Sequence, residues 1–501
     1  MRHNMLKLKL RLALLVIFLA GISVFSYAQI TLTIEQALDI AEENNPSMKS
    51  SKLSFERTQL LLEVSRIALK PQFSMNVNPL NYSQSRTFDN YNSAWYTNKN
   101  FSSSGTFRGD LPILWTDGSL SLTNTFRWQD NEAQRASGTI INQAFVNDLS
   151  LRLNQPLFTY NRRKMEMRTL EFNHENSGIS YALQRLSMEQ SITRQFYSVY
   201  SSQNSLEISQ AELENSRRNY EIISAKVEAN LSAREELFQA EVNLANAESN
   251  VQSGEVSLQN AKDALKQTLG MSLNEDINVV VNIEVVPMLV NTEKAIQSGL
   301  LSRMELRQRE ISMEQAELTM ITTKATNEFS GNVSLALGIT GDNKNLGNIY
   351  DAPTQSPSVS VTFSIPIFDW GQRKTRIKAQ EISQTITQLD YENEKVNIEL
   401  AIRQSLRSLA NLRTQIEIAE KNVRNADLTY SLNEVRYREG DLTGLQMSQY
   451  QSQLSNSKTN LVSAQIRYKN ELLNLKIITL YDFENDKPII PVRELSSLTI
   501  R

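Results

Sequence analysis

The segment SVSVTFSI, at residues 358–365, alternates between small hydroxyl side chains and apolar ones. Successive side chains of a β-strand point to opposite faces, so Val359, Val361 and Phe363 share one face while serine and threonine occupy the other. A strand of about ten residues with this pattern is typical of a transmembrane β-barrel, which has lipid on one side and water on the other. A half-buried strand of a soluble sheet is the alternative interpretation.

The same alternation occurs at two other places in the chain. Apolar residues occupy every second position from Val333 to Ile339, and a polar loop at residues 341–345 separates this run from the segment at 358–365. A third run, from Leu149 to Leu153, has the same period. The first two runs predict a β-hairpin with one apolar face.

The chain also contains a long internal duplication. Residues 149–269 align with residues 359–479 without a gap. The matched identities are spread along both copies: Pro156/Pro366, Phe158/Phe368, Glu189/Glu399, Tyr220/Tyr430 and Leu244/Leu454. The upstream segments align with a different offset, because the first copy carries an insertion at about residues 78–145. A duplication of this length is no short solenoid repeat, and it predicts two similar arms in one architecture.

Long helices are predicted after each strand region. Apolar residues recur at every seventh position in both copies, at Ile192, Val199, Leu206, Leu213 and Tyr220 and at Ile402, Leu409, Ile416, Val423 and Tyr430. This period of 3.5 residues predicts helices that supercoil against their neighbours. Residues 158–228 contain no proline, and about 70 helical residues extend about 100 Å, which suits a periplasm better than a globular domain. A free-standing two-stranded coiled coil fits the period equally well.

The insertion at residues 78–145 is rich in aromatic residues. The turn Asp117-Gly118 separates two strand-like runs, at 105–115 and 119–128, and this arrangement predicts a β-hairpin. The hairpin either extends the barrel outward or forms its first strand pair. Its aromatic residues form either a girdle at a membrane interface or the apolar core of the hairpin.

Residues 1–28 have the features of a secretory signal peptide, namely a basic start, an apolar run and small residues at the end. An N-terminal membrane anchor is the alternative, for which the run is short. The chain has no cysteine, which rules out thiolate metal sites, disulfides and lipid attachment to cysteine. The formal net charge of −3 argues against nucleic-acid binding. His174 is the one histidine after the signal, so neither a Ser-His-Asp set nor a zinc site is expected, and no cofactor is predicted.

The order of these motifs resembles the TolC-like outer-membrane efflux family. The motifs that carry the resemblance are LTIEQALDIAEENNP at 32–46, QPLF at 155–158, IPIFDWG at 365–371 and the helix turn REGDLT at 438–443. Each motif is weak alone, but their order and the duplication are specific, and the resemblance covers nearly the whole chain after the signal peptide.

The resemblance implies a mixed α+β membrane protein that forms a homotrimer. Each protomer is expected to give four strands to a twelve-stranded transmembrane β-barrel, which a long periplasmic α-helical barrel continues. Four strands cannot close a barrel alone, and cyclic symmetry closes their open edges. The expected divisions of the chain are a signal peptide at 1–28, a first repeat at 29–270, an equatorial connector at 271–290, a second repeat at 291–480 and a tail at 481–501.

The implied function is that of an outer-membrane exit duct in a tripartite efflux pump or a type I secretion system of a Gram-negative bacterium. Such a duct conducts passively and is not an enzyme. The implied partners are two further copies of the chain, outer-membrane lipid, a periplasmic adaptor protein and an inner-membrane transporter of the RND or ABC type. The alternatives are a periplasmic coiled-coil adaptor, which has one helical hairpin, and a structural envelope protein, which leaves the strands unexplained.

The resemblance also points to candidate site residues at the helix turns. The periplasmic tips that dock the adaptor are expected at Asn230, Leu231 and Ser232 and at Gly440, Asp441, Leu442 and Thr443. The entrance gate is expected at Glu236, Tyr437, Gln446 and Gln449, with Tyr437 and Glu236 forming a hydrogen-bonded latch. Relatives carry acidic residues at the positions of the two glutamines, so weak cation selectivity is predicted for this entrance.

Overall fold

The structure is a computed structural model that describes residues 30–90, 93–135, 138–281, 283, 285, 288–439 and 441–489. The predicted signal peptide, the tip residue Gly440 and most of the predicted tail therefore lie outside the described residues. The chain divides into two compact units. One contains residues 52–181 and 303–397, and the other contains residues 182–302, 398–490 and the segment up to Ser51.

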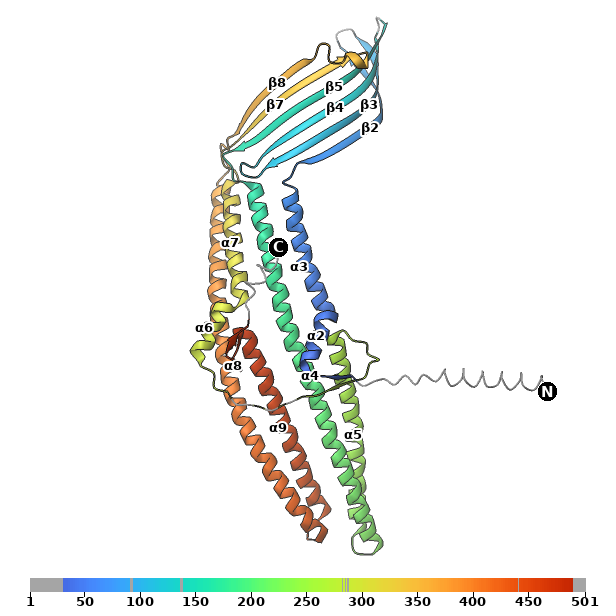
Figure 1. The fold of residues 1–501 in the computed structure, drawn as a ribbon, viewed down its shortest axis with the longest axis vertical. Coiled ribbons are helices and arrows are strands. Elements are labelled where there is room, and N and C mark those ends of the chain that lie inside the picture. Colours follow the sequence, from blue (N-terminus) through green and yellow to red (C-terminus); the bar gives the residue numbers. More distant parts are fainter. Residues whose placement is uncertain are drawn as a thin grey trace, which may run out of the picture. The chain divides into compact units, whose positions relative to one another are not determined.

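The first of these units contains a six-stranded antiparallel sheet (Figure 1). Its strands, in spatial order, are β2 (Gln72–Asp89), β3 (Ala94–Ile113), β4 (Gly118–Arg135), β5 (Gly138–Leu157), β7 (Ser330–Asn343) and β8 (Thr354–Ser364). The sheet of one chain thus has six strands, two more than the four that each protomer was expected to give to the barrel. The insertion is the cause, because it supplies the hairpin β3–β4, whose strands pair with β2 and β5 along nearly their whole length.

The strand register gives this sheet one apolar face and one polar face. Paired neighbours such as Leu122 and Leu151, or Leu335 and Val359, lie on the same face because side chains alternate in phase across the sheet. The apolar face carries Phe73, Met75, Val77, Phe101, Phe107, Leu122, Phe126, Trp128, Phe145, Leu149, Leu151, Val333, Leu335, Leu337, Ile339, Val359, Val361 and Phe363. The polar face carries Ser74, Asn76, Ser104, Thr106, Thr123, Thr125, Asp148, Ser150, Ser334, Ser360 and Thr362.

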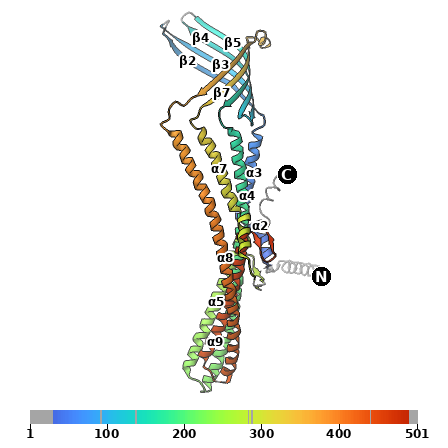
Figure 2. The same ribbon diagram turned by 90° about the vertical axis from the view of Figure 1, so that its left-hand side faces the viewer.

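Four helical segments accompany the sheet in the order of the strands to which they connect (Figures 1 and 2). They are α3 (Pro46–Ile67), the first part of α4 (Arg162–Glu228), α7 (Met304–Ala325) and the first part of α8 (Gln372–Glu439). Phe55 of α3 stacks on His174 of α4, with ring centroids 4.9 Å apart, and burial lowers the pKa of His174. Arg307 of α7 donates to both carboxylate oxygens of Glu175, at 2.7 and 3.1 Å. Arg309 of α7 pairs with Glu394 of α8 at 3.2 Å.

The other unit is built from two helical hairpins and short connecting elements. The hairpins join α4 to α5 (Arg234–Leu269) and α8 to α9 (Gly444–Thr479). The connecting elements are α2 (Ile34–Asn44), α6 (Thr292–Ser302), the parallel pair β1 (Ile30–Leu32) and β6 (Ile277–Val279), and the pair β9 (Tyr481–Asp482) and β10 (Lys487–Pro488). The short 3₁₀ helix η1 (Leu346–Asn348) belongs to the unit that contains the sheet, where it lies in the loop between β7 and β8. The seven-residue positions are the core of these hairpins, since Ile192, Val199 and Ile402 are fully buried.

The turn between β3 and β4 is tied to the start of α4. Its Asp117 has a positive φ of 60°, and its carboxylate is buried. That carboxylate pairs with the guanidinium groups of Arg162 at 3.1 Å and Arg163 at 3.3 Å. The side chain of Gln155 also donates to the carbonyl of Thr116 at 2.8 Å. The hairpin therefore turns at the end of the sheet from which α4 departs, which we call the helix end.

We expect Asp117→Ala to lower the melting temperature of the sheet, because it removes the buried carboxylate that accepts from the Arg162 side chain and the Arg163 amide and forms an ion pair with the Arg163 guanidinium. The cost of such a loss is about 1–3 kcal/mol. The measurement is the temperature at which detergent-purified protein changes its mobility on denaturing gels. Asp110→Ala is the matched control, since its pair with Arg108 is exposed on both sides and contributes little. Equal melting temperatures for the two variants would contradict the anchoring role.

Candidate functional site

Two parts of the molecule qualify as functional sites, namely the turns of the two helical hairpins and the exposed face of the sheet. At the first turn, α4 ends at Glu228 and α5 begins at Arg234. Asn230 adopts a left-handed conformation with φ of 57°, and the amide of Leu231 donates to the carbonyl of Lys226 at 2.8 Å. This is a helix C-cap in which asparagine replaces the usual glycine. Leu231 is 78% exposed.

The second turn has a similar design with different residues. The amide of Asp441 donates to the carbonyl of Arg436 at 2.9 Å, which closes the end of α8. Thr443 caps α9: its hydroxyl accepts from the amide of Gln446 at 3.3 Å, and its own amide donates to the Gln446 side chain at 3.1 Å. This reciprocal pair is a capping box, so Gln446 is engaged in local structure. Gln449 lies one turn later and is exposed.

Within the described residues, Tyr437 and Glu236, the predicted latch residues, each form a hydrogen bond with another partner. The buried hydroxyl of Tyr437 donates to the side-chain oxygen of Asn219 on α4, and Lys226 lies 5.6 Å from its ring centroid. Glu236 instead accepts a hydrogen bond from Ser232. Burial raises the pKa of Tyr437, and the negative charge of Glu236 raises it further. Asn219 was not singled out by the sequence, in which it is one of many polar residues on a long helix.

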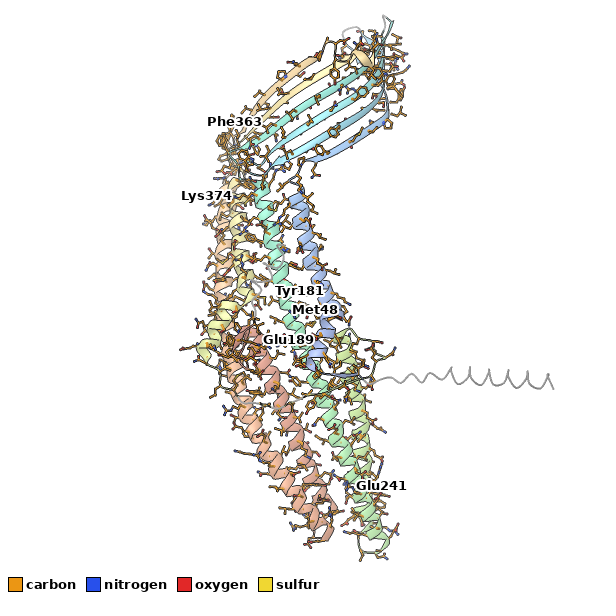
Figure 3. The ribbon with its side chains drawn as sticks, viewed as in Figure 1. Met48, Tyr181, Glu189, Glu241, Phe363 and Lys374 are labelled. Atoms are coloured by element: carbon orange, nitrogen blue, oxygen red, sulfur yellow. The ribbon has the colours of Figure 1, made fainter. Side chains whose placement is uncertain are left out.

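The apolar face of the sheet is exposed, and rows of aromatic rings mark both ends of it. In the row far from the helices, Phe101 and Trp128 meet edge to face at 5.6 Å between centroids. In the row at the helix end, Phe329 stacks on Phe363 at 5.6 Å and Phe73 on Phe107 at 5.9 Å. Figure 3 labels Phe363 at this end of the sheet and Lys374 in the first turn of α8. Such aromatic rows flank the lipid-facing band of transmembrane barrels.

Beyond the far aromatic row, charged and polar pairs interrupt the apolar surface of this face, which also carries the exposed side chains of Phe88, Trp95 and Ile141 there. Lys99 and Glu132, which are paired across β3 and β4, form an ion pair at 3.3 Å. Gln143 donates to Asp130 at 2.9 Å on the neighbouring strand pair. The apolar surface is therefore a band of limited height that crosses all six strands. Among the described residues, no helix is long and apolar enough to cross a membrane.

Both outer strands of the sheet have an open edge. Within the described residues, β2 pairs with β3 alone and β8 pairs with β7 alone. Each open edge presents backbone N–H and C=O groups that lack a partner strand, and such edges readily pair with another chain.

Several solved structures share this fold. The chain is similar to the Campylobacter jejuni outer membrane channel CmeC, with 15% identity, a TM-score of 0.69 and coverage of 93% of this chain and 88% of that one. It is also similar to the Neisseria gonorrhoeae outer membrane channel MtrE in its open state, with 15% identity, a TM-score of 0.65 and coverage of 91% and 90%. The Vibrio cholerae outer membrane protein VceC gives 13% identity, a TM-score of 0.64 and coverage of 91% and 97%. No curated protein matches the sequence.

The fold is thus that of outer-membrane channels. Residues 119–271 and 296–479, more than half of the chain, match the sequence model of the outer membrane efflux protein family, and the protein belongs to this family. It is an outer-membrane exit channel for efflux and resides in the outer membrane of a Gram-negative bacterium. The predicted family is confirmed, and it is a family of channels rather than enzymes.

Proposed function

We propose that three copies of this chain form a passive exit duct, which a periplasmic adaptor connects to an inner-membrane transporter of the RND or ABC type. The system served is a tripartite efflux pump or a type I secretion system. The observation that carries the proposal is the sheet, with its apolar face, its polar face and its two open edges. A bilayer offers no hydrogen-bond partners to open strand edges, so the sheet has to close through other copies.

The helices that flank the sheet support the same contact between copies. Because α3 leads into β2 and β8 leads into α8, the two outermost helices accompany the two open edges. On α3, Leu53, Leu60 and Ile67 are exposed at intervals of seven residues, and on α8, Ile382, Leu389 and Val396 repeat this pattern. Exposed apolar residues at this period form the seam of a coiled coil.

The two seams and the two edges together define one head-to-tail interface. In it, β8 and α8 of one copy lie against β2 and α3 of the next. These two surfaces differ, and each copy carries both of them. A ring closes when the β8 and α8 side of the last copy binds the β2 and α3 side of the first copy. In this ring the apolar band faces lipid, while the polar face, with residues such as Ser150 and Ser360, lines a water-filled lumen.

The hairpin turns are proposed as the docking surface for the adaptor. Asn230, Leu231 and Ser232 lie in one turn and Asp441, Leu442 and Thr443 in the other, and both predicted sets thus fall between helices. Gly440, also predicted at this surface, lies outside the described residues. Exposed Leu231 and half-buried Leu442 provide apolar surface that an adaptor can bury at each turn.

The contact between Tyr437 and Asn219 is proposed to help hold the entrance closed, and it replaces the pairing of Tyr437 with Glu236. It connects α8 to α4, and therefore joins the two hairpins of one copy. Loss of this hydrogen bond frees one hairpin to move against the other. Gln446 and Gln449 add dipoles but no net charge to the entrance, so selectivity for cations is weak.

The lipid-facing assignment is tested by a pair of charge insertions on β8. Val361→Arg places a charge on the apolar face, where it loses its hydration to lipid, and Thr362→Arg places it on the polar face. We expect the first variant to lose heat-modifiable trimers from outer-membrane fractions and the second to keep them. Similar trimer yields for the two variants would show that the faces are assigned wrongly.

The gating role is tested by single-channel conductance in planar bilayers. Tyr437→Phe removes the hydroxyl and keeps the ring, so we expect a higher conductance than in the unaltered protein. Asn219→Ala should give the same increase, and the double variant should add little, because both changes remove one bond. Glu236→Ala is the matched control and should leave conductance unchanged. An increase with Glu236→Ala, together with none in Tyr437→Phe, would overturn the proposed contact.

A further inference from the structure

We propose that the transmembrane barrel of this protein has eighteen strands, six from each of three copies, and that the hairpin β3–β4 is the element that widens it. The proposal rests on the trimer of the proposed function. It departs from the twelve strands that the family resemblance implies, and it follows from four features of the hairpin.

The first feature is the strand pairing. In the pairing of β2 with β3, Gln72 lies opposite Asp110 at one end and Asp89 lies opposite Ala94 at the other. One irregularity in the register occurs between Asn78 and Asn81. β4 pairs with β3 over 17 consecutive positions. It also pairs with β5, from Ser119 opposite Asn154 to Arg135 opposite Gly138. A flap outside the barrel would leave β2 and β5 free to pair with each other. Here β3 and β4 occupy the positions between them, so the hairpin is part of the sheet itself.

The second feature is the alternation of the hairpin side chains. Leu122, Phe126 and Trp128 of β4 lie on the apolar face, in register with residues of β5. Thr123 and Thr125 lie on the polar face. The hairpin also contributes Phe101 and Trp128 to the aromatic row far from the helices. If the hairpin were surrounded by water, an exposed apolar band would not stabilise it. Its apolar residues instead continue the apolar band of β7 and β8 across the sheet.

The third feature is the place of the turn. Asp117 fixes the β3–β4 turn to Arg162 and Arg163 at the start of α4, which lies at the helix end of the sheet. The strands β3 and β4 are therefore joined at the same end of the sheet at which β5 ends, and they cross the whole apolar band. A decoration of the outer rim would instead turn far from the helices.

The fourth feature is the asymmetry of the duplication. The first repeat has four strands between α3 and α4, and the second has two between α7 and α8. The helical hairpins are not affected, since each repeat contributes one. The helical barrel can therefore still be built from three copies, while each copy adds six strands instead of four to the transmembrane barrel.

The added strands enlarge the lumen considerably. With strands about 4.8 Å apart and tilted by about 40°, twelve strands give a barrel about 24 Å across and eighteen give about 36 Å. The cross-section grows by about 2.3-fold, because it follows the square of the diameter. Barrels of this larger size leave an open aqueous channel between their side chains. The outer-membrane end of this duct is accordingly wide, and it does not need to open for solutes to pass.

Electron microscopy of the full-length protein in lipid nanodiscs, together with its native mass, tests the proposal. We expect three copies, eighteen strands in a ring and a diameter of about 36 Å. The matched control is deletion of residues 94–137, which joins β2 to β5 by the existing turn and removes β3 and β4. This variant should give a trimer whose barrel is narrower by about one third. Twelve strands in the unaltered protein, from three copies with the hairpin outside or from two copies of six strands, would overturn the proposal.

A second pair of variants keeps the test decisive if the deletion does not fold. Leu122→Arg and Thr123→Arg both lie on β4, in the hairpin, but on opposite faces. We expect the first to reduce the trimer yield about tenfold or more and the second to leave it near normal. Equal yields would overturn the barrel position of the hairpin. Failure of the proposed function is distinguishable, since it would show as an absence of trimers and of channel activity in the unaltered protein.

Discussion

The structure depends on one constraint, which is that a bilayer supplies no hydrogen bonds to a polypeptide backbone. The sheet of this chain has an apolar band that belongs in lipid, yet its outer strands β2 and β8 have open edges. A single copy therefore cannot be stable in a membrane. In the proposed ring of copies these edges are paired, and the flanking helices α3 and α8 carry exposed apolar seams that fit such a ring.

The different residue patterns of the sheet and the helices follow from this constraint. The sheet needs two chemically different faces, because lipid and water lie on opposite sides of the same backbone. The helices need only narrow apolar seams, because water surrounds them and their backbone is already hydrogen bonded within each helix. Specific contacts occur where elements change direction, as at Asp117 beside α4 and at Tyr437 near the end of α8.

Much of the fold could be predicted from local patterns in the sequence. The alternation in β8, the seven-residue period of α4 and α8, and the turn at Asp117-Gly118 each depend on neighbouring residues, and the structure contains all three elements. The strand number could not be predicted. The apolar alternation of the runs in the insertion stops beyond the band, at positions such as Lys99 and Glu132, so the full length of β3 and β4 is not apparent from the sequence. The partner of Tyr437 was missed for a similar reason, since Asn219 lies far away in the sequence and has no distinguishing pattern.

The proposed channel requires that one face of the sheet contacts lipid and the other lines water. It is tested most directly by single cysteines on β5, because the chain has no cysteine of its own to give a background. Ser150→Cys and Leu151→Cys differ by one residue and lie on opposite faces. In proteoliposomes, a membrane-impermeant maleimide should label the first rapidly and the second hardly at all. Equal labelling of both positions, or faster labelling of Leu151→Cys, would contradict the account.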